Sequence, residues 1–144
     1  MKKLYAILLM AAVVLFSGCA SVPMASKEAD MAAKQFKPTE GKSNIYIYRN
    51  ESFGAAAKMT VVVDGKLAGS TAAKTYMVES VNPGQHTIIS KSEDDSTLNL
   101  TTEANKNYFV WQEVKMGMWS ARSQLHFVNE EQGMEGVNEC ELIK

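Results

Sequence analysis

Short apolar runs alternate with turn sequences between residues 43 and 128, and no helical period separates them. The runs contain many β-branched and aromatic residues, which favour strands. Asp64-Gly65 lies between two of them and is a typical hairpin signal, because both residues accept a positive φ. This spacing predicts a mostly β fold, an antiparallel β-sandwich of about seven to eight strands. The predicted strands lie around residues 45–48, 60–63, 66–69, 75–78, 86–89, 97–100, 107–116 and 119–128.

One predicted strand is apolar on both of its faces. It contains Tyr108-Phe109-Val110-Trp111, so the side chains on both faces of the strand are apolar or aromatic. Strands of this kind are typically covered on both sides by other parts of the protein. We therefore expect this strand to lie at the centre of its sheet.

Two short helices are predicted at the ends of this β region. Ala29, Ala32, Ala33 and Phe36 follow helical spacing, with Ser26 before them as a capping residue and Pro38 after them as a stop. We expect this short N-terminal helix to dock on its own domain, the alternative being a surface for a partner. The acidic tail, residues 130–144, predicts a short C-terminal helix around Met134 and Val137 before it ends in Leu142-Ile143.

The first residues indicate export. Lys2 and Lys3 precede an apolar run, residues 4–16, which is shorter than the roughly 20 residues of a membrane-spanning helix and typical of a signal-peptide core. Leu15-Phe16-Ser17-Gly18-Cys19 resembles the bacterial lipobox, although the lipobox usually has Leu where Phe16 stands. This resemblance implies cleavage before Cys19 and acylation of its sulfur, as by palmitate. The alternative is an ordinary secreted protein in which Cys19 is incidental.

Acylation would make the membrane the first partner of the chain. Each buried CH₂ group contributes about 0.8 kcal/mol, and two or more chains hold a protein stably on a bilayer. Ala20 and Ser21 follow the cysteine, and by resemblance to Gram-negative lipoproteins this implies the inner leaflet of the outer membrane, facing the periplasm. The expected organisation is a signal peptide (1–18), an acylated cysteine with a tether and short helix (19–42), and a β-sandwich domain (43–144).

Charge and cysteine content exclude several classes of protein. The formal net charge is −1, and removing residues 1–18 takes away two lysines and no acid. The chain therefore has no excess of basic residues that would favour binding to nucleic acid or to anionic lipid.

Cys140 would be the remaining thiol, so no internal disulfide is expected. It stands between Glu139 and Glu141, which should raise its pKa, and we expect a half-buried structural cysteine, with pairing between chains as the alternative.

The order of these features resembles a family of small bacterial lipoproteins that carry one β-sandwich domain of unknown function. The resemblance covers the chain from about Ala32 to the C-terminus and implies a fold and an envelope location, without any catalytic residue. Val-Asp-Gly-Lys and Pro-Gly-Gln-His also resemble PEGA-type surface modules, more loosely. The stretches that carry the resemblance are the lipobox and residues 32–38, 45–49, 63–66 and 83–88.

Candidate metal chemistry is confined to one stretch near the last predicted strands. Met116, Met118 and His126, with Trp119 beside them, offer thioether and imidazole ligands that suit Cu(I). Methionine and tryptophan at a strand junction more commonly fill a core, and we favour that interpretation. The other histidine, His86, is expected to be a core-edge imidazole bonded to backbone.

Other motifs point away from catalysis. Glu93-Asp94-Asp95 lacks the ligand spacing of a calcium loop and is expected to be a solvated turn. The sequence has no Gly-x-Ser-x-Gly elbow, phosphate-binding glycine loop or His-Glu-x-x-His zinc motif. Aromatic residues on strands usually pack in a core, although an exposed recognition surface is the alternative. These residues are Tyr46, Tyr48, Tyr76, Tyr108 and Trp111.

Together these observations predict a non-enzymatic, membrane-anchored envelope lipoprotein. Its β-sandwich is expected to bind a protein or another envelope component, with no cofactor and no nucleic acid. One alternative is a periplasmic carrier of a small ligand or Cu(I) that uses the Met116–His126 region. A second alternative is an envelope hydrolase, which would require a deep cleft with titratable groups.

Overall fold

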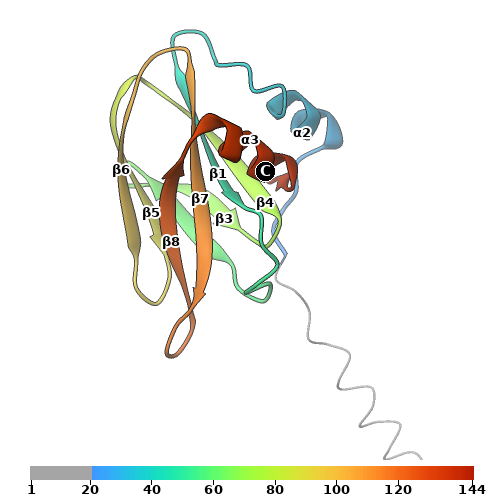
Figure 1. The fold of residues 1–144 in the computed structure, drawn as a ribbon, viewed down its shortest axis with the longest axis vertical. Helices are drawn as coiled ribbons and strands as arrows, with labels where there is room; N and C mark the ends of the chain where they lie inside the picture. Colours follow the sequence, from blue (N-terminus) through green and yellow to red (C-terminus); the bar gives the residue numbers. More distant parts are fainter. Residues whose placement is uncertain (1–20) are drawn as a thin grey trace, which may run out of the picture.

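The computed structural model describes residues 21–144, so Cys19 and the predicted signal peptide lie outside the described residues (Figure 1). Nine strands form two sheets in this part of the chain, and two helices accompany them. The strands are β1 (Ser43–Arg49), β2 (Met59–Val63), β3 (Lys66–Thr71), β4 (Thr75–Val81), β5 (Gly84–Lys91), β6 (Ser96–Thr102), β7 (Lys106–Met116), β8 (Ala121–Val128) and β9 (Glu141–Leu142). The helices are α2 (Lys27–Ala33) and α3 (Glu130–Asn138).

The predicted β-sandwich is confirmed, and its strand order adds a feature that the sequence did not predict. One sheet has the order β8-β7-β1-β4-β9 and the other the order β3-β2-β5-β6. Most neighbours are antiparallel, but β1 runs parallel to β7 and β9 runs parallel to β4. The prediction of a purely antiparallel sandwich was therefore wrong at these two pairs. Hairpin signals report only neighbours in sequence, whereas β1 and β7 are joined through five intervening strands.

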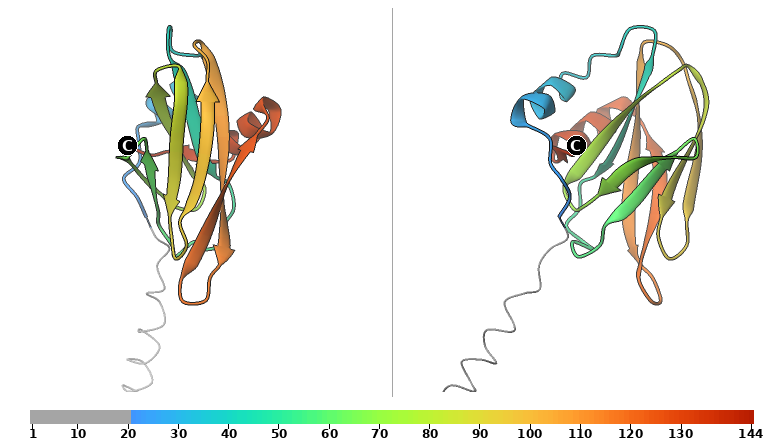
Figure 2. Two further views of the ribbon diagram at one scale, coloured as in Figure 1. Left: turned by 90° about the vertical axis from the view of Figure 1, so that its left-hand side faces the viewer. Right: turned by 180° about the vertical axis from the view of Figure 1, so that it is seen from behind.

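The apolar core lies between the two sheets, and a second apolar layer lies under the helices. On β1, Ile45 and Ile47 point into the sandwich while Tyr46 and Tyr48 lie on the opposite face, and all four are buried. On β7, Phe109 and Val110 are buried on opposite faces in the same way, which confirms that this strand is covered on both sides. It lies inside its sheet, between β8 and β1, but the central position that was predicted for it belongs to β1. Figure 2 shows the helices on one side of the five-stranded sheet.

Two glycines let α3 lie close to this sheet. A Cβ atom on Gly133 would lie 2.1 Å from Cγ of Phe109, and a Cβ on Gly136 would lie 2.2 Å from Cε2 of Tyr48. Neither ring can move away easily, because both are buried in the layer between sheet and helix. The glycines therefore set the distance at which α3 covers the sheet.

The segment before β1 lies along the domain. Ser26 caps α2 by accepting from the N–H of Ala29 at 3.1 Å, as predicted. Asp30 then accepts from the Tyr76 hydroxyl at 2.8 Å and from the N–H of Leu142 at 3.0 Å, which docks the helix on its own domain. The expected tether, residues 19–42, is therefore packed against the sandwich from at least Val22 onward, because Val22 lies against the core and Met24 forms a backbone bridge to Ile143.

The interior of the sandwich is polar near one end. Arg49 is fully buried there and donates to the carbonyl oxygens of Ala57 at 2.8 Å and Gly54 at 3.0 Å. Burial lowers the pKa of this guanidinium. Because both acceptors belong to the β1–β2 loop, Arg49 fixes this loop from the inside. Gln112 continues the buried polar network by donating to the Ser90 hydroxyl at 2.6 Å.

Candidate functional site

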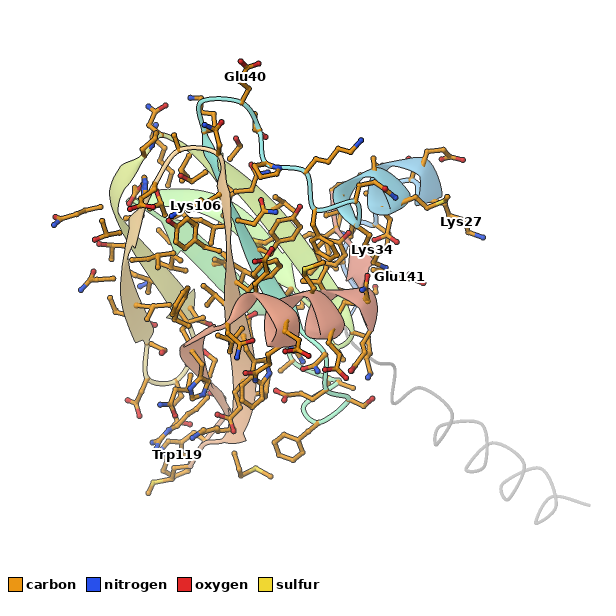
Figure 3. The ribbon with its side chains drawn as sticks, turned by 45° about the horizontal axis from the view of Figure 1, so that its top comes forward. Lys27, Lys34, Glu40, Lys106, Trp119 and Glu141 are labelled. Carbon is orange, nitrogen blue, oxygen red and sulfur yellow. The ribbon has the colours of Figure 1, made fainter. Side chains whose placement is uncertain are left out.

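Large apolar side chains gather on the surface at one end of the domain. Trp119 is 87% exposed, Met116 78%, Met118 77% and Phe53 52%. They come from the β7–β8 turn and the β1–β2 loop, and they line a hollow of about 380 Å³. Figure 3 shows Trp119 at the end of the domain opposite Glu40. We call Phe53, Met116, Met118 and Trp119 the apolar tip.

A carboxylate from another turn holds the apolar tip in shape. Glu93, between β5 and β6, accepts from the backbone N–H groups of Ser120 at 2.7 Å, Trp119 at 2.8 Å and Met118 at 3.2 Å. Arg122 donates to the same carboxylate at 2.8 Å. The N–H groups of Ser120 and Trp119, followed by Arg122, lower the pKa of Glu93 to about 2. The turn is therefore fixed with its apolar side chains pointing away from the braced backbone.

Two further contacts fix the surroundings of the tip. Gly117 has no room for a side chain, because a Cβ there would lie 1.9 Å from the carbonyl oxygen of Ser120. Glu51 accepts from the N–H of Val114 at 2.5 Å and so ties the β1–β2 loop to β7. The apolar tip is thus a defined surface formed by two segments far apart in the sequence.

A second surface lies on the outer face of the five-stranded sheet beside α3. Trp111 and His126 are cross-strand partners whose rings stack with centroids 5.0 Å apart. Nε2 of His126 lies 2.7 Å from a carboxylate oxygen of Glu113, and this hydrogen bond lowers the pKa of Glu113. Among the described residues, His126 has no hydrogen bond to a serine, threonine or cysteine. The pair therefore lacks the base–nucleophile contact of covalent catalysis.

A groove of about 270 Å³ runs between this cluster and α3. The indole N–H of Trp111 is buried and has no acceptor within the described part of the chain. Around it the groove offers amide and carboxylate groups, among which Asn50 donates to Glu139 at 3.2 Å. Such a mixture of one aromatic edge and several polar groups can bind a polar segment by hydrogen bonds. The lining residues are Tyr48, Asn50, Trp111, Gln132, Glu135, Gly136 and Glu139.

The candidate Cu(I) ligands are separated by the strand register. Met116 pairs with Ala121 at the turn, whereas His126 pairs with Trp111 five positions further along β8. At about 3.3 Å per residue this is roughly 16 Å, too far for one ion to bind both ends. The expectation that Met116, Met118 and Trp119 fill a core was wrong. They lie at a hairpin tip, where side chains have no second layer to pack against.

The other candidate residues are buried or hydrogen-bonded within the fold. Both ring nitrogens of His86 are engaged, one with Asp64 at 2.6 Å and the other with the carbonyl oxygen of Asn82 at 2.7 Å. Cys140 is buried rather than half-buried, and this burial raises its pKa to about 12, with Glu139 adding a smaller contribution. Glu93-Asp94-Asp95 forms a turn, as expected, but its first residue braces the β7–β8 hairpin.

The alternative of an exposed aromatic surface is wrong for three of its five residues. Tyr46, Tyr48 and Tyr76 are buried under the helices, and only Tyr108 and Trp111 are partly exposed. The exposed aromatic residues that the sequence did not single out as a surface are, within the described part of the chain, Phe53, Trp119 and Phe127. A usable signal was the short Met-Gly-Met-Trp-Ser stretch between two long strands, since the residues of a tight hairpin turn face solvent.

Neither a metal-binding cluster nor a membrane-spanning helix is found in residues 21–144. In this range no three or more His, Cys, Asp and Glu residues are grouped so that they could hold a metal ion. None of the helices in it is both long and apolar enough to span a bilayer. Cys19, the predicted lipidation site, lies outside the described residues.

Comparison with known proteins identifies the family. A family model described as "Protein of unknown function (DUF2846)" matches residues 39–124. A protein of Haemophilus influenzae, described as uncharacterized, is 38% identical over 130 residues, which cover 89% of this chain and 77% of that protein. The chain belongs to the DUF2846 family. The DUF2846 match includes the braced hairpin and the β1–β2 loop but not α2, α3 or β9. No solved structure matches the chain significantly.

The resemblance to a family with a domain of unknown function is thereby confirmed at that level. The likeness to lipoproteins and to PEGA-type modules stays a prediction from the sequence.

Proposed function

We propose that this DUF2846 protein is a non-enzymatic envelope lipoprotein whose β-sandwich binds another envelope protein at the periplasmic face of the outer membrane. The anchor in this proposal is Cys19, which ends the lipobox-like stretch of residues 15–19. Two acyl chains or more would hold the protein on a bilayer without any membrane-spanning segment.

The engagement of the potentially catalytic side chains supports a binding role. Both nitrogens of His86 are hydrogen-bonded, and Nε2 of His126 is paired with Glu113. The thiol of Cys140 is buried, and its raised pKa keeps it protonated at neutral pH. These groups have roles in holding the fold, so we assign the protein a recognition function.

The observation that carries the proposal is the groove beside Trp111. The indole N–H of Trp111 is buried and has no acceptor within residues 21–144, and a buried donor without a partner costs free energy, which a carbonyl group that displaced the covering atoms would recover. Gln132 and Glu135 on α3 add exposed hydrogen-bonding groups along the same groove. A protein segment with free backbone carbonyl groups would satisfy this arrangement.

Two experiments test the two parts of this function. Metabolic labelling with an alkyne fatty acid is expected to mark the wild-type protein, while Cys19→Ser abolishes the label. A photo-crosslinking residue at position 132 is expected to capture a reproducible envelope protein in living cells, whereas the same residue at position 40, at another part of the surface, does not. Trp111→Phe, which removes only the N–H donor and some ring area, should weaken that capture. Equal crosslinking from both positions would refute the groove as the binding surface.

A further inference from the structure

The apolar tip and the start of the described chain lie at the same end of the domain. In Figures 1 and 2, the first described residues enter at the end that carries the β7–β8 turn. The opposite end carries charged residues, including Glu40 and Lys106, which Figure 3 labels. The domain is therefore polarised, with the apolar tip at the end where the described chain begins and charged residues at the other end.

The chain between Cys19 and the folded domain is short. Lys144 donates from its backbone N–H to the carbonyl oxygen of Pro23 at 2.9 Å, and Ala25 donates to that of Leu142 at 2.9 Å, so this segment is fixed along the domain. Cys19 precedes Pro23 by only four residues, which span at most about 14 Å when fully extended. Acyl chains on Cys19 would therefore hold this end of the sandwich close to the lipid headgroups.

We propose that the apolar tip is a second membrane contact, at which Phe53, Met116, Met118 and Trp119 enter the headgroup region of the bilayer that holds the acylated Cys19. This inference rests on the lipid anchor of the proposed function. It adds an orientation, in which the long axis of the sandwich stands away from the membrane and the groove beside Trp111 stays accessible.

The chemistry of the tip suits a lipid interface. Tryptophan prefers the boundary between headgroups and hydrocarbon, because its ring is apolar while its N–H still finds water or ester oxygens. Contiguous exposed apolar patches on soluble domains mark interaction surfaces. Because Glu93 already fixes the backbone of the turn, no conformational entropy of the turn has to be lost when its side chains enter the lipid.

The charges behind the tip balance one another. Lys115 and Arg122 face each other across the hairpin, and they pair with Glu113 at 3.5 Å and with Glu93 at 2.8 Å, respectively. Asp94 lies 3.0 Å from the Arg122 guanidinium as well. The contact is therefore expected to depend on apolar side chains, with little dependence on salt or on anionic lipid.

Tryptophan fluorescence of the acylated full chain tests the proposal, because the sequence has only two tryptophans. Trp111→Phe leaves Trp119 as the reporter, and Trp119→Phe leaves Trp111 as the matched control. Each protein is reconstituted into vesicles of phosphatidylethanolamine and phosphatidylglycerol with brominated acyl chains. We expect the emission of Trp119 to shift to shorter wavelength and to be quenched by bromine, and that of Trp111 to be unaffected.

The outcomes separate this inference from the anchor. Flotation of the protein with vesicles, combined with unquenched Trp119 emission at the wavelength of water-exposed indole, refutes the tip contact and leaves the anchor intact. Failure of the wild-type protein to float refutes both. A shorter wavelength without bromine quenching, dependent on protein concentration, would show a contact between two copies instead and overturn the proposal.

Transfer of the acylated protein between vesicles gives a second measurement. Trp119→Ser removes the whole indole ring from the contact, and we expect the lost apolar burial to accelerate transfer about tenfold. Leu67→Ser is the control, because Leu67 is 72% exposed but lies on β3, outside the tip. Equal transfer rates for wild type and Trp119→Ser would contradict the proposal.

Discussion

Replacing Gly136 of α3 by alanine is expected to destabilise the domain, although alanine is the better helix former. An added Cβ at this position would lie 2.2 Å from Cε2, 2.5 Å from Cζ and 2.9 Å from Cδ2 of the Tyr48 ring. Carbon atoms prefer separations of about 3.5–4.0 Å, so either the helix or the ring must move by more than 1 Å. The ring is buried and lies between strand and helix, which leaves it little freedom.

Two opposing effects set the size of the change. Alanine in a helix interior gains about 1 kcal/mol over glycine from propensity. Overpacking of a buried layer costs about 1–3 kcal/mol, and the upper end applies here because three ring atoms are in the way. The expected net loss is therefore about 2 kcal/mol of unfolding free energy. For a domain of this size that corresponds to a melting midpoint lower by roughly 6–10 °C.

Urea unfolding followed by circular dichroism measures this loss, and a double-mutant cycle assigns its cause. Tyr48→Val removes the three ring atoms nearest to the added methyl group. In that background Gly136→Ala should be neutral or stabilising, because only the gain in helix propensity remains. Gln132→Ala, an exposed change on the same helix, controls for general effects on α3. A stabilised Gly136→Ala protein, or an equal loss in both backgrounds, would refute the packing argument.

Three further predictions concern charge and reactivity. Burial opposes ionisation of Asp30, but hydrogen bonds from Lys34 and Tyr76 hold its pKa below the usual value. The ionised Asp30 therefore stabilises the folded protein above about pH 4, and this stabilisation is lost as pH falls through the folded pKa. The stability gap between wild type and Asp30→Asn, measured by urea unfolding, should therefore shrink below about pH 4, and a constant gap would contradict this. Glu93→Gln should speed amide exchange at residues 118–120 several-fold while Asp95→Asn, on the same turn, does not; equal exchange would contradict the brace. Cys140 should react with a thiol reagent at pH 8 only after unfolding, because the thiol is buried and burial raises its pKa to about 12; rapid labelling of the native protein would contradict this burial.

The sequence predicted the strands well, because their signals are local. Asp64 and Gly65 both have positive φ, as the hairpin signal between β2 and β3 requires. In β7 the sequence has large apolar residues on both faces of the strand, and this pattern predicted that both faces are covered. The two-residue strand β9 was missed because so short a segment has no period of its own.

The candidate sites were harder to predict, because a side chain's exposure depends on what covers it. Trp119 and Tyr76 are similar apolar residues in the sequence pattern, yet one is 87% exposed and the other is buried under α2. The role of Glu93 depends on a turn 25 residues further along the chain. No local signal reports such a contact.

The sequence by itself determined where eight of the strands lie along the chain, the hairpin at residues 64–65, the capped helix after Ser26 and the family-like order of motifs. Those features depend on neighbours along the chain, where propensity and turn chemistry act directly. Only the tertiary structure decided that β1 pairs with β7, that α3 approaches Tyr48 through Gly136, and that exposed apolar side chains gather at the tip of the β7–β8 hairpin. These depend on the distance in space between segments far apart in sequence, which packing of the whole domain sets.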